Sequence, residues 1–295
     1  MNFLKNKKEL AAVMLALMLV IACAVSVAEA AFTPLAMDAQ AGNEPGEQNY
    51  LPDMGGYEDP SLKVTIETMR EHDTNILVAR VKIADPSQIR TTMAARYGST
   101  GTVLPDRLAK RVNAVLAVNG DFFNFNSTGY LVRQGKRYRD KTHSDFDILI
   151  IDEKGDFHII VDPTEEKVKS FPGTIVNSFN FGPALVVDGE IITTTKELNV
   201  GLDKETQRMG VGQMGPLEYI CVATEGPENE GSAGLTIPEF AQLMKDLGAV
   251  QAYNLDGGNS SVMLFHNTKI NGQKASKMRA LGDILYVTTA IPDGQ

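Results

Sequence analysis

The sequence predicts an α+β domain with a mostly antiparallel or mixed β-sheet. Most of the predicted strands come in pairs joined by short turns, as in β-hairpins, and only a few segments have the spacing of an amphipathic helix. This order of elements favours helices packed on an antiparallel sheet. The chain has 295 residues, of which 43% are hydrophobic, so it is long enough for a single substantial domain after a leader.

The first thirty residues have the composition of an export signal. A lysine-rich start precedes an apolar run from 10 to about 28, and the small residues Ala28–Ala30 suit a signal peptidase. The run is also long enough to remain as a membrane anchor, and Cys23 in VIAC resembles a bacterial lipoprotein acceptor. We expect residues 1–30 to be a signal peptide or membrane anchor. All three alternatives export the rest of the chain, either secreted or anchored to the outer face of a bacterial cytoplasmic membrane.

A flexible linker is predicted at 31–60. This segment is rich in proline, glycine and acidic residues and has no sustained hydrophobic period. The folded part is expected to begin near Ser61, with a single domain at 61–291.

Hairpins account for most of the predicted strands. Their strands alternate between apolar and polar residues or form short apolar runs, with turn residues between them. Asp188–Gly189 has the sequence of a type I′ turn. The four hairpins are expected at 62–85, 145–161, 181–193 and 208–226.

Two helices are predicted, each leading into a buried strand. A short helix at 104–112 precedes the apolar strand 114–118. The clearer helix is at 235–249, where Thr236 and Glu239 have the spacing of a capping box, and it leads into the strand 250–255. Its apolar face and its terminal glycine are formed by Phe240, Leu243, Met244, Leu247 and Gly248.

Composition limits the classes of ligand. The net charge of −9 and the pI of about 5.0 argue against nucleic-acid binding. Tryptophan is absent, so any recognition of a sugar depends on tyrosine, phenylalanine and hydrogen bonds. An anionic substrate would require a local cluster of arginines, because the net charge repels it.

Polar side chains gather in three segments at predicted strand ends, at 118–124, 207–212 and 254–261. The first and third share one form, a buried strand followed by asparagine, a carboxylate and glycine. Glycines let the backbone approach a ligand closely and expose its amide groups. A site is one interpretation of these segments, and an ordinary Asp-Gly turn at Asp256–Gly257 is the alternative.

Six segments resemble, in the same order, the successive blocks of the phosphodiester glycosidase family. The most specific is GLTIPEFAQLMKDLGAVQAYNLDGGNSSVM at 234–263. The others are AVNGDFFN, FNFGPALVVDGEI, RMGVG, ATEG and RALGDILYV. The resemblance implies an enzyme that cleaves a sugar, such as N-acetylglucosamine, from a phosphodiester at the anomeric carbon. Bacterial members are often linked to envelope or exopolysaccharide metabolism, so the implied partner is a phosphate-linked carbohydrate of the envelope.

The chain departs from the family's pattern at three positions. Asn259 stands where glycine is usual, Glu225 where aspartate is common, and Met209 where threonine is common after the arginine. The first departure is expected to tilt the turn and the other two to change the pocket. The resemblance therefore does not transfer the substrate of the animal members to this chain.

The resemblance also implies roles for charged residues. A sugar 1-phosphodiester carries a good leaving group, so the enzyme chiefly needs cations at the phosphate and a carboxylate near the developing oxocarbenium ion. Arg208 matches the family's arginine and is expected to bind the phosphate, with Arg279 as the second candidate. Asp256 is the leading carboxylate, as nucleophile, base or stabiliser, and Glu225 is the second. The alternatives are structural ion pairs for the arginines, with Asp283 available to Arg279, and a turn-shaping role for Asp256.

The remaining candidates are expected to contact the substrate or to shape the loops around it. They are Asn119, Asp121, Asn254, Gly257, Gly258 and Ser260. The sequence requires no cofactor, and it has no HExxH motif or Cys/His zinc spacing. A divalent cation such as calcium, held by Asp121 and Asp256, is an alternative for which the spacing gives no positive signal.

Two rival functions differ from a glycosidase in chemistry. A metal-dependent phosphodiesterase would break the P–O bond and release a sugar phosphate. A non-catalytic envelope-binding module would use the same pocket for recognition alone.

Overall fold

Antiparallel strands dominate the fold, as the hairpin pattern predicts. In the part of the chain that the computed structural model describes, strands form sheets of eight, five, three and two members, and every pairing is antiparallel. The described residues are 32–143, 145–194, 201–229, 231–272 and 278–292. The expected signal or anchor at 1–30 lies outside them. No helix within these ranges is long and apolar enough to cross a membrane.

The eight-stranded sheet contains three of the four predicted hairpins. Asp188 and Gly189 both have positive φ, 51° and 80°, as a type I′ turn requires. In spatial order the strands are β1 (Gly56–Glu58), β2 (Leu62–Glu71), β3 (Thr74–Ile83), β14 (Glu218–Thr224), β13 (Met209–Gly215), β15 (Gln251–Leu255), β11 (Ala184–Val187) and β12 (Glu190–Ile191).

The three smaller sheets contain the other strands. The five-stranded sheet has the order β17 (Thr268–Lys269), β16 (Met263–Phe265), β5 (Leu116–Asn119), β18 (Asp283–Val287) and β4 (Ile89–Met93). The three-stranded sheet has the order β10 (Ile175–Asn180), β8 (Ile148–Asp152) and β9 (Phe157–Ile160), and contains the fourth predicted hairpin, β8–β9. The last sheet pairs β6 (Gly129–Arg133) with β7 (Lys136–Lys141).

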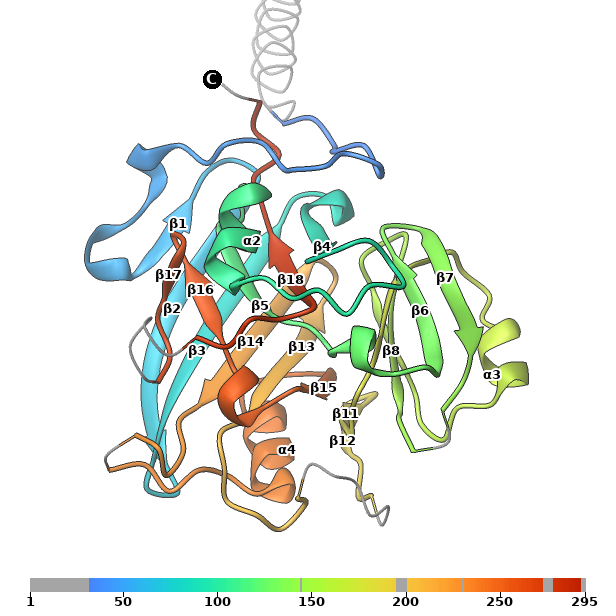
Figure 1. Ribbon diagram of the computed structural model, residues 1–295. Coiled ribbons are helices and arrows are strands. Elements are labelled where there is room, and N and C mark those ends of the chain that lie inside the picture. The colour runs from blue at the N-terminus through green and yellow to red at the C-terminus, as the bar shows by residue number, and fades with distance from the viewer. Residues whose placement is uncertain (1–31, 144, 195–200, 230, 273–277, 293–295) are drawn as a thin grey trace, which may run out of the picture. The chain divides into compact units, whose positions relative to one another are not determined.

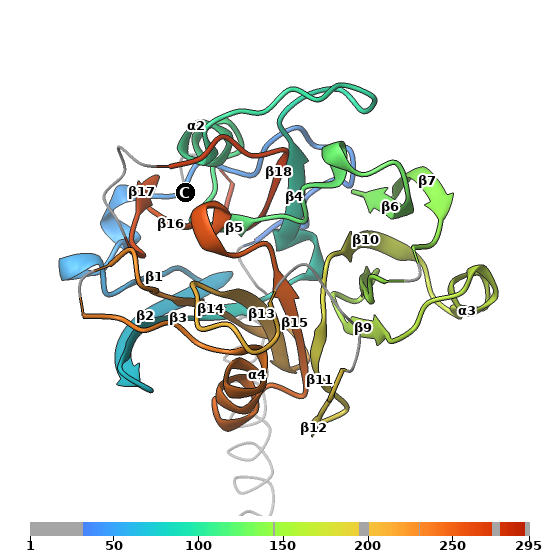
Figure 2. The same ribbon diagram turned by 60° about the horizontal axis from the view of Figure 1, so that its bottom comes forward.

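Two helices cover the outer faces of the two larger sheets (Figures 1 and 2). The main core lies between the eight-stranded and five-stranded sheets, where Val211 and Tyr253 of the first share a cluster with Val118 and Leu285 of the second. Helix α4 (Ile237–Asp246) closes the opposite face of the eight-stranded sheet, and α2 (Pro105–Arg111) closes the outer face of the five-stranded sheet. Helix α3 (Glu165–Lys169) packs on β8. Short 3₁₀ turns lie at Glu47–Asn49, Pro52–Met54, Pro86–Gln88, Phe123–Phe125 and Gly258–Ser260.

Helix α4 follows the sequence prediction closely. Thr236 caps its N-terminus, and the side chains of Thr236 and Glu239 form the expected capping box. Phe240, Leu243 and Met244 are buried against the sheet, and burying each such side chain contributes about 1.5–3 kcal/mol. Gly248 follows the helix with a φ of 98°, which no other residue adopts as easily.

Residues 32–60 differ in the structure from the flexible linker that the sequence predicts. Instead of a solvated segment, residues 32–60 lie along the domain and donate or accept hydrogen bonds with it. The buried guanidinium of Arg90 donates to the carbonyls of Ala36, Met37 and Ala39, and β1 pairs with β2. The segment lacks a hydrophobic period, so composition suggests a linker. The segment is held by hydrogen bonds from the buried guanidinium of Arg90 to its backbone carbonyls. Composition does not reveal such contacts.

Candidate functional site

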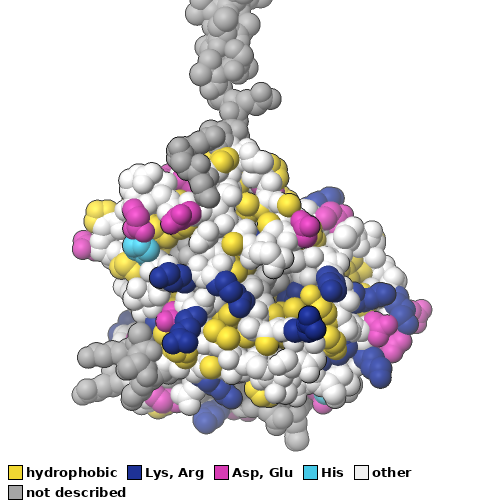
Figure 3. Space-filling view, turned by 45° about the horizontal axis from the view of Figure 1, so that its top comes forward, with side chains coloured by type: hydrophobic (Ala, Val, Ile, Leu, Met, Phe, Trp, Pro, Cys, Tyr) yellow, Lys and Arg dark blue, Asp and Glu magenta, His cyan; other side chains and the backbone are white. Residues whose placement is uncertain are grey.

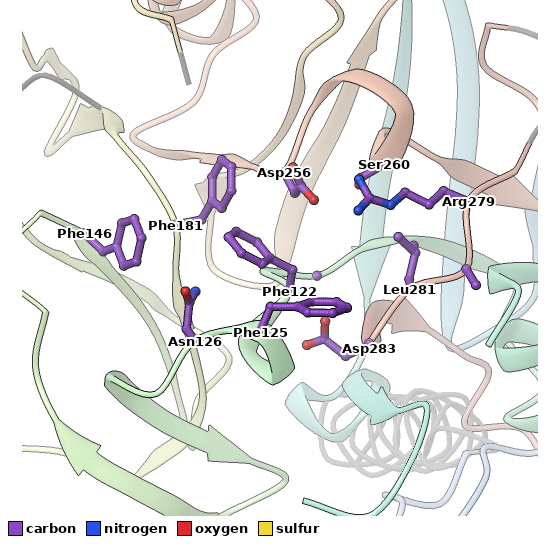
Figure 4. A pocket seen from close by; sticks show the side chains of 13 residues that line it. Phe122, Phe125, Asn126, Phe146, Phe181, Asp256, Ser260, Arg279, Leu281 and Asp283 are labelled. Carbon is purple, nitrogen blue, oxygen red and sulfur yellow. The ribbon is translucent and has the colours of Figure 1, made fainter. Parts of the chain in front are cut away.

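A pocket of about 480 Å³ lies where five segments of the chain meet, one of which, the segment before β8, contributes Phe146 (Figure 4). The segment after β5 contributes Phe122 and Phe125, and the β10–β11 turn contributes Phe181. The loop after β15 contributes Asp256 and Ser260. The segment before β18 contributes Arg279 and the residues up to Asp283. Two of the three polar segments singled out in the sequence therefore line one pocket.

Asp256 is the carboxylate at the centre of this pocket. Its side chain faces the cavity, and the Arg279 guanidinium reaches toward Ser260 beside it (Figure 4). Arg279 Nη1 lies 3.4 Å from Ser260 Oγ. Burial raises the pKa of Asp256, while the hydrogen bond from Ser260 and the charge of Arg279 oppose that rise. The group is a desolvated carboxylate held next to a cation.

The loop that carries Asp256 is tied to both large sheets. Asn119 Nδ2 donates to the carbonyl of Asp256 at 2.7 Å, and Asn119 Oδ1 accepts from Val262 N at 3.1 Å. A Cβ at Gly257 would lie 2.6 Å from the carbonyl oxygen of Gln207, so only glycine allows this approach to β13. Gly258 has a φ of 54°. The predicted Asn119, Gly257 and Gly258 thus position the carboxylate.

A buried ion cluster reaches the pocket through Asp283. Arg133 Nη2 lies 2.9 Å from Asp121 Oδ1 and 2.6 Å from Asp283 Oδ2. Asp121 also accepts from the backbone amides of Phe123 and Asn180, at 3.2 and 2.7 Å. Asp121 therefore anchors the loop that carries the phenylalanines, and its two oxygens are occupied by donors. Asp283, considered as a partner for Arg279, instead pairs with Arg133.

Arg208 is placed away from this pocket. Its guanidinium is buried and donates to the carbonyls of Leu235, Gly201 and Lys204, at 2.9, 2.8 and 2.6 Å. Burial lowers its pKa to about 10. Arg208 is not among the residues that line the pocket. In this arrangement its guanidinium holds together the backbone of Gly201, Lys204 and Leu235.

Glu225 and Asn254 also hold backbone and side-chain groups together. Glu225 Oε2 accepts from Asn75 Nδ2 and from Ser232 Oγ, both at 3.0 Å, and Glu225 does not line the pocket. Asn254 Nδ2 donates to the carbonyl of Gly182 at 2.8 Å, which fixes the turn next to Phe181. The structure brings neither side chain to Asp256.

One side of the pocket is an aromatic wall formed by Phe122, Phe146 and Phe181, which the sequence analysis did not single out. Phe122 and Phe181 meet edge to face with ring centroids 5.5 Å apart, and Phe146 lines the same side. Phe125 is 58% exposed, which is unusual for a phenylalanine. Phe122 has a φ of 49°, a strained value for a bulky residue. The signal in the sequence was the run DFFNF at 121–125.

Comparison with known proteins assigns the family. The family model described as phosphodiester glycosidase matches residues 112–288, more than half of the chain. The chain belongs to the phosphodiester glycosidase family. All the residues that line the pocket lie within the matched region.

Two solved structures and one further sequence are similar to this member of the phosphodiester glycosidase family. The zebrafish N-acetylglucosamine-1-phosphodiester alpha-N-acetylglucosaminidase catalytic domain, auto-inhibited by its pro-peptide, superposes with a TM-score of 0.64 at 16% identity, covering 84% of this chain and 87% of that one. A hypothetical protein from Synechocystis superposes with a TM-score of 0.53 at 16% identity, covering 77% and 62%. The SPbeta prophage-derived uncharacterized protein YomE of Bacillus subtilis (strain 168) is 24% identical over 202 residues, covering 67% of this chain. The chain spans 31% of the length of YomE.

The donor set of the phosphodiester glycosidase pocket does not fit the calcium site considered from the sequence. Asp121 already accepts from Arg133, Phe123 and Asn180, so it has little capacity left for a cation. Across the described ranges, no group of three or more His, Cys, Asp and Glu side chains has metal-ligand geometry. The charge of Arg279 and a hydrogen bond from Ser260 act on Asp256.

Proposed function

We propose that this protein is an exported hydrolase that releases a sugar, such as N-acetylglucosamine, from a sugar 1-phosphodiester of a bacterial envelope glycan. One observation carries the proposal: the desolvated carboxylate of Asp256 and the guanidinium of Arg279 face the same phenylalanine-lined pocket. This is the charge arrangement that cleavage at an anomeric carbon bearing a phosphate requires.

The sugar ring binds against the aromatic wall. Apolar faces of a pyranose stack on phenylalanine, and Phe122 and Phe181 present such surfaces beside Asp256. Ser260 and the amide of Asn126 supply hydrogen bonds to hydroxyl groups at the edge of the pocket. This arrangement agrees with the absence of tryptophan, which leaves phenylalanine and hydrogen bonds for sugar recognition.

Arg279 is the cation that meets the phosphate. Its planar guanidinium can bind two phosphate oxygens and stabilise the departing phosphate monoester. Because that leaving group is already a stable anion, little general-acid assistance is needed. Asp256, in its ionised form, acts at the sugar. It serves as nucleophile, as the base that activates water or as stabiliser of the oxocarbenium ion. Arg208 and Glu225 act in this scheme as positioning residues, because other groups engage them.

Basic side chains on the face that carries α2 suit an anionic polymer. Helix α2 carries the exposed residues Arg107, Lys110 and Arg111. Figure 3, which brings the α2 end forward, shows Lys and Arg side chains gathered over this face despite the net charge of −9. Such a patch attracts a phosphate-rich glycan locally. Residues 1–30 have the composition of an export signal, and this supports export to the compartment that holds such polymers.

The test is release of free N-acetylglucosamine from a diester of N-acetylglucosamine α-1-phosphate by the purified full chain. Asp256→Asn and Arg279→Met should each lower kcat/KM by at least about 100-fold. Glu190→Gln, a carboxylate-to-amide change at an exposed side chain on β12 outside the pocket, is the matched control and should keep wild-type activity. Release of the sugar phosphate instead would support the phosphodiesterase alternative. Binding without turnover, retained in Asp256→Asn, would support the binding module.

A further inference from the structure

A second cavity is separated from the pocket of Asp256 by the ion pair between Arg133 and Asp283. It is a groove of about 680 Å³, larger than the pocket of Asp256, and the two share no lining residue. Arg133 lines the groove, whereas Asp283, 2.6 Å from it, lines the other pocket. A ligand in the groove therefore meets a different set of side chains from a ligand at Asp256.

Ordered backbone builds this groove. Three segments supply most of its lining, 37–41, 91–96 and 133–138. The guanidinium of Arg90 holds the first segment through the carbonyls of Met37 and Ala39, at 3.3 and 3.0 Å. In the second segment, Ala94 N donates to the carbonyl of Gly282 at 2.7 Å. Part of the groove thus comes from the segment that composition predicts to be a linker.

Basic residues outnumber acidic ones in the lining of the groove. Four of its lining residues are Lys or Arg, and one, Asp38, is acidic. In the whole chain the balance is the reverse, with 37 acidic and 28 basic residues. The groove is therefore a local concentration of positive charge on an acidic protein, which favours an anionic ligand there.

Three of the four cations have no carboxylate partner. They are Arg96, Arg111 and Lys136, and none of them forms an ion pair within the part of the chain that the structure describes. All three are exposed. Arg111 Nη2 donates to Thr92 Oγ1 at 3.1 Å and to the carbonyl of Met93 at 2.7 Å, which orients its guanidinium. Because these cations come from separate segments, the fold and not a local run of sequence brings them to one groove.

Two tyrosines extend the groove with aromatic surface. Lys136 Nζ lies 5.1 Å from the ring centroid of Tyr138, which lines the groove. Tyr138 in turn contacts Tyr97, with ring centroids 5.2 Å apart, and Tyr97 is 37% exposed. A tyrosine ring offers an apolar face to a sugar and a hydroxyl for hydrogen bonds. Cations beside tyrosines suit a ligand that carries both charge and sugar rings.

We propose that this groove is a second binding site, which holds a phosphate-bearing glycan without cleaving it. Arg96, Arg111 and Lys136 bind phosphate groups of the polymer, and Tyr97 and Tyr138 pack on its sugars. The site retains the protein on a polymer that its net charge of −9 would otherwise repel. The inference does not depend on the reaction proposed for Asp256, because binding in the groove requires no turnover.

The experiment is calorimetric titration of the purified full chain with dextran phosphate and with uncharged dextran of the same length. The wild type should bind dextran phosphate and not dextran, and the binding should weaken as salt concentration rises. The double variant Arg96→Met/Lys136→Met should weaken it by about tenfold. Lys63→Met/Lys82→Met removes two exposed lysines outside the groove, changes the net charge equally and should bind as the wild type does. Equal losses in the two double variants, or no binding by the wild type, would overturn the proposal.

Two further variants distinguish the groove from the pocket of Asp256 and the sugar contact from charge alone. Arg279→Met should bind dextran phosphate as the wild type does, whether or not the protein hydrolyses a diester. Loss of binding in this variant would place the polymer at the other pocket and overturn the proposal. Tyr97→Ser should weaken dextran phosphate by about 3- to 10-fold and leave binding of inorganic polyphosphate, which has no sugar, unchanged. Equal binding of dextran phosphate by Tyr97→Ser and the wild type would overturn the sugar contact.

Discussion

Asn119 donates from Nδ2 to the carbonyl oxygen of Asp256 at 2.7 Å, and so links the end of β5 to the loop that bears the candidate carboxylate. These residues are 137 positions apart in the sequence. The hydrogen bond fixes the backbone from which the Asp256 side chain enters the pocket, and its partner on the same amide, Val262 N, closes the loop from the other side. The orientation of the carboxylate thus depends on a residue that does not line the pocket.

Replacing Asn119 should therefore lower activity more than binding. In Asn119→Ala we expect kcat to fall by about 10- to 100-fold, because small displacements of a reacting group have effects of this size. KM should change little, since Arg279 and the aromatic wall remain. Steady-state kinetics with the diester substrate checks this split. Asn254→Ala, which also removes a buried asparagine but not the link to Asp256, is the control. Equal losses of kcat in both variants would contradict the positioning role.

The pH dependence should reveal the environment of Asp256. Burial raises its pKa above the ordinary value, and activity needs the ionised form, so kcat/KM should be lost as pH falls through that raised pKa. Ser260→Ala removes a hydrogen bond that lowers the pKa. The acidic limb of the pH profile should therefore move to higher pH in this variant. A limb that stays in place, or moves to lower pH, would mean that another group titrates.

The cluster of Arg133, Asp121 and Asp283 should be essential for stability. Arg133→Met leaves two buried carboxylates without their cation, and removing one partner of a buried ion pair costs about 3–5 kcal/mol. Urea denaturation followed by circular dichroism measures the loss. Arg137→Met, on the exposed edge of the neighbouring strand, should change the free energy of unfolding by less than about 0.5 kcal/mol. Similar midpoints for the two variants would show that the cluster contributes little.

Local patterns explain what the sequence predicted well. The hairpins and α4 are specified within short windows, by alternation, turn residues and a capping box, so they could be read without tertiary information. Arg208 and Arg279 show what local sequence patterns cannot predict. Both arginines follow from the same resemblance, yet only the fold buries Arg208 against the carbonyls of 201–204 and 235 and leaves Arg279 on the pocket.

Other features depend on contacts that no window of sequence contains. Arg133 lies in YLVRQG, which reads as an ordinary strand, and its two carboxylates come from separate segments. The aromatic wall combines Phe122 with Phe181, which are distant in the chain. The ordered segment at 32–60 depends on Arg90, a residue outside it. In each case the residue contacts a partner from a distant segment, and only the fold brings the two together.

Gly257 should tolerate no side chain, although its backbone angles are accessible to other residues. Its φ is −105°, so alanine there meets no conformational penalty of its own, but the added Cβ would lie 2.6 Å from the carbonyl oxygen of Gln207. The loop must shift to relieve this contact, and the shift moves Asp256. We expect Gly257→Ala to lower kcat/KM by about 10- to 100-fold. Gly215→Ala, where a Cβ meets nothing within 4 Å, is the control and should keep wild-type activity.

The capping box of α4 offers a stability test with a defined sign. The hydrogen bond from the Thr236 backbone lowers the pKa of Glu239. A carboxyl whose folded pKa is depressed contributes stability above its unfolded pKa, about 4.3, and loses that contribution as pH falls through the folded value. Glu239→Gln should therefore destabilise the protein at pH 7 by about 0.5–1 kcal/mol, with the difference from wild type shrinking below about pH 4. Urea midpoints at several pH values measure it. A difference that is constant with pH would assign the effect to packing of the side chain, because packing does not titrate.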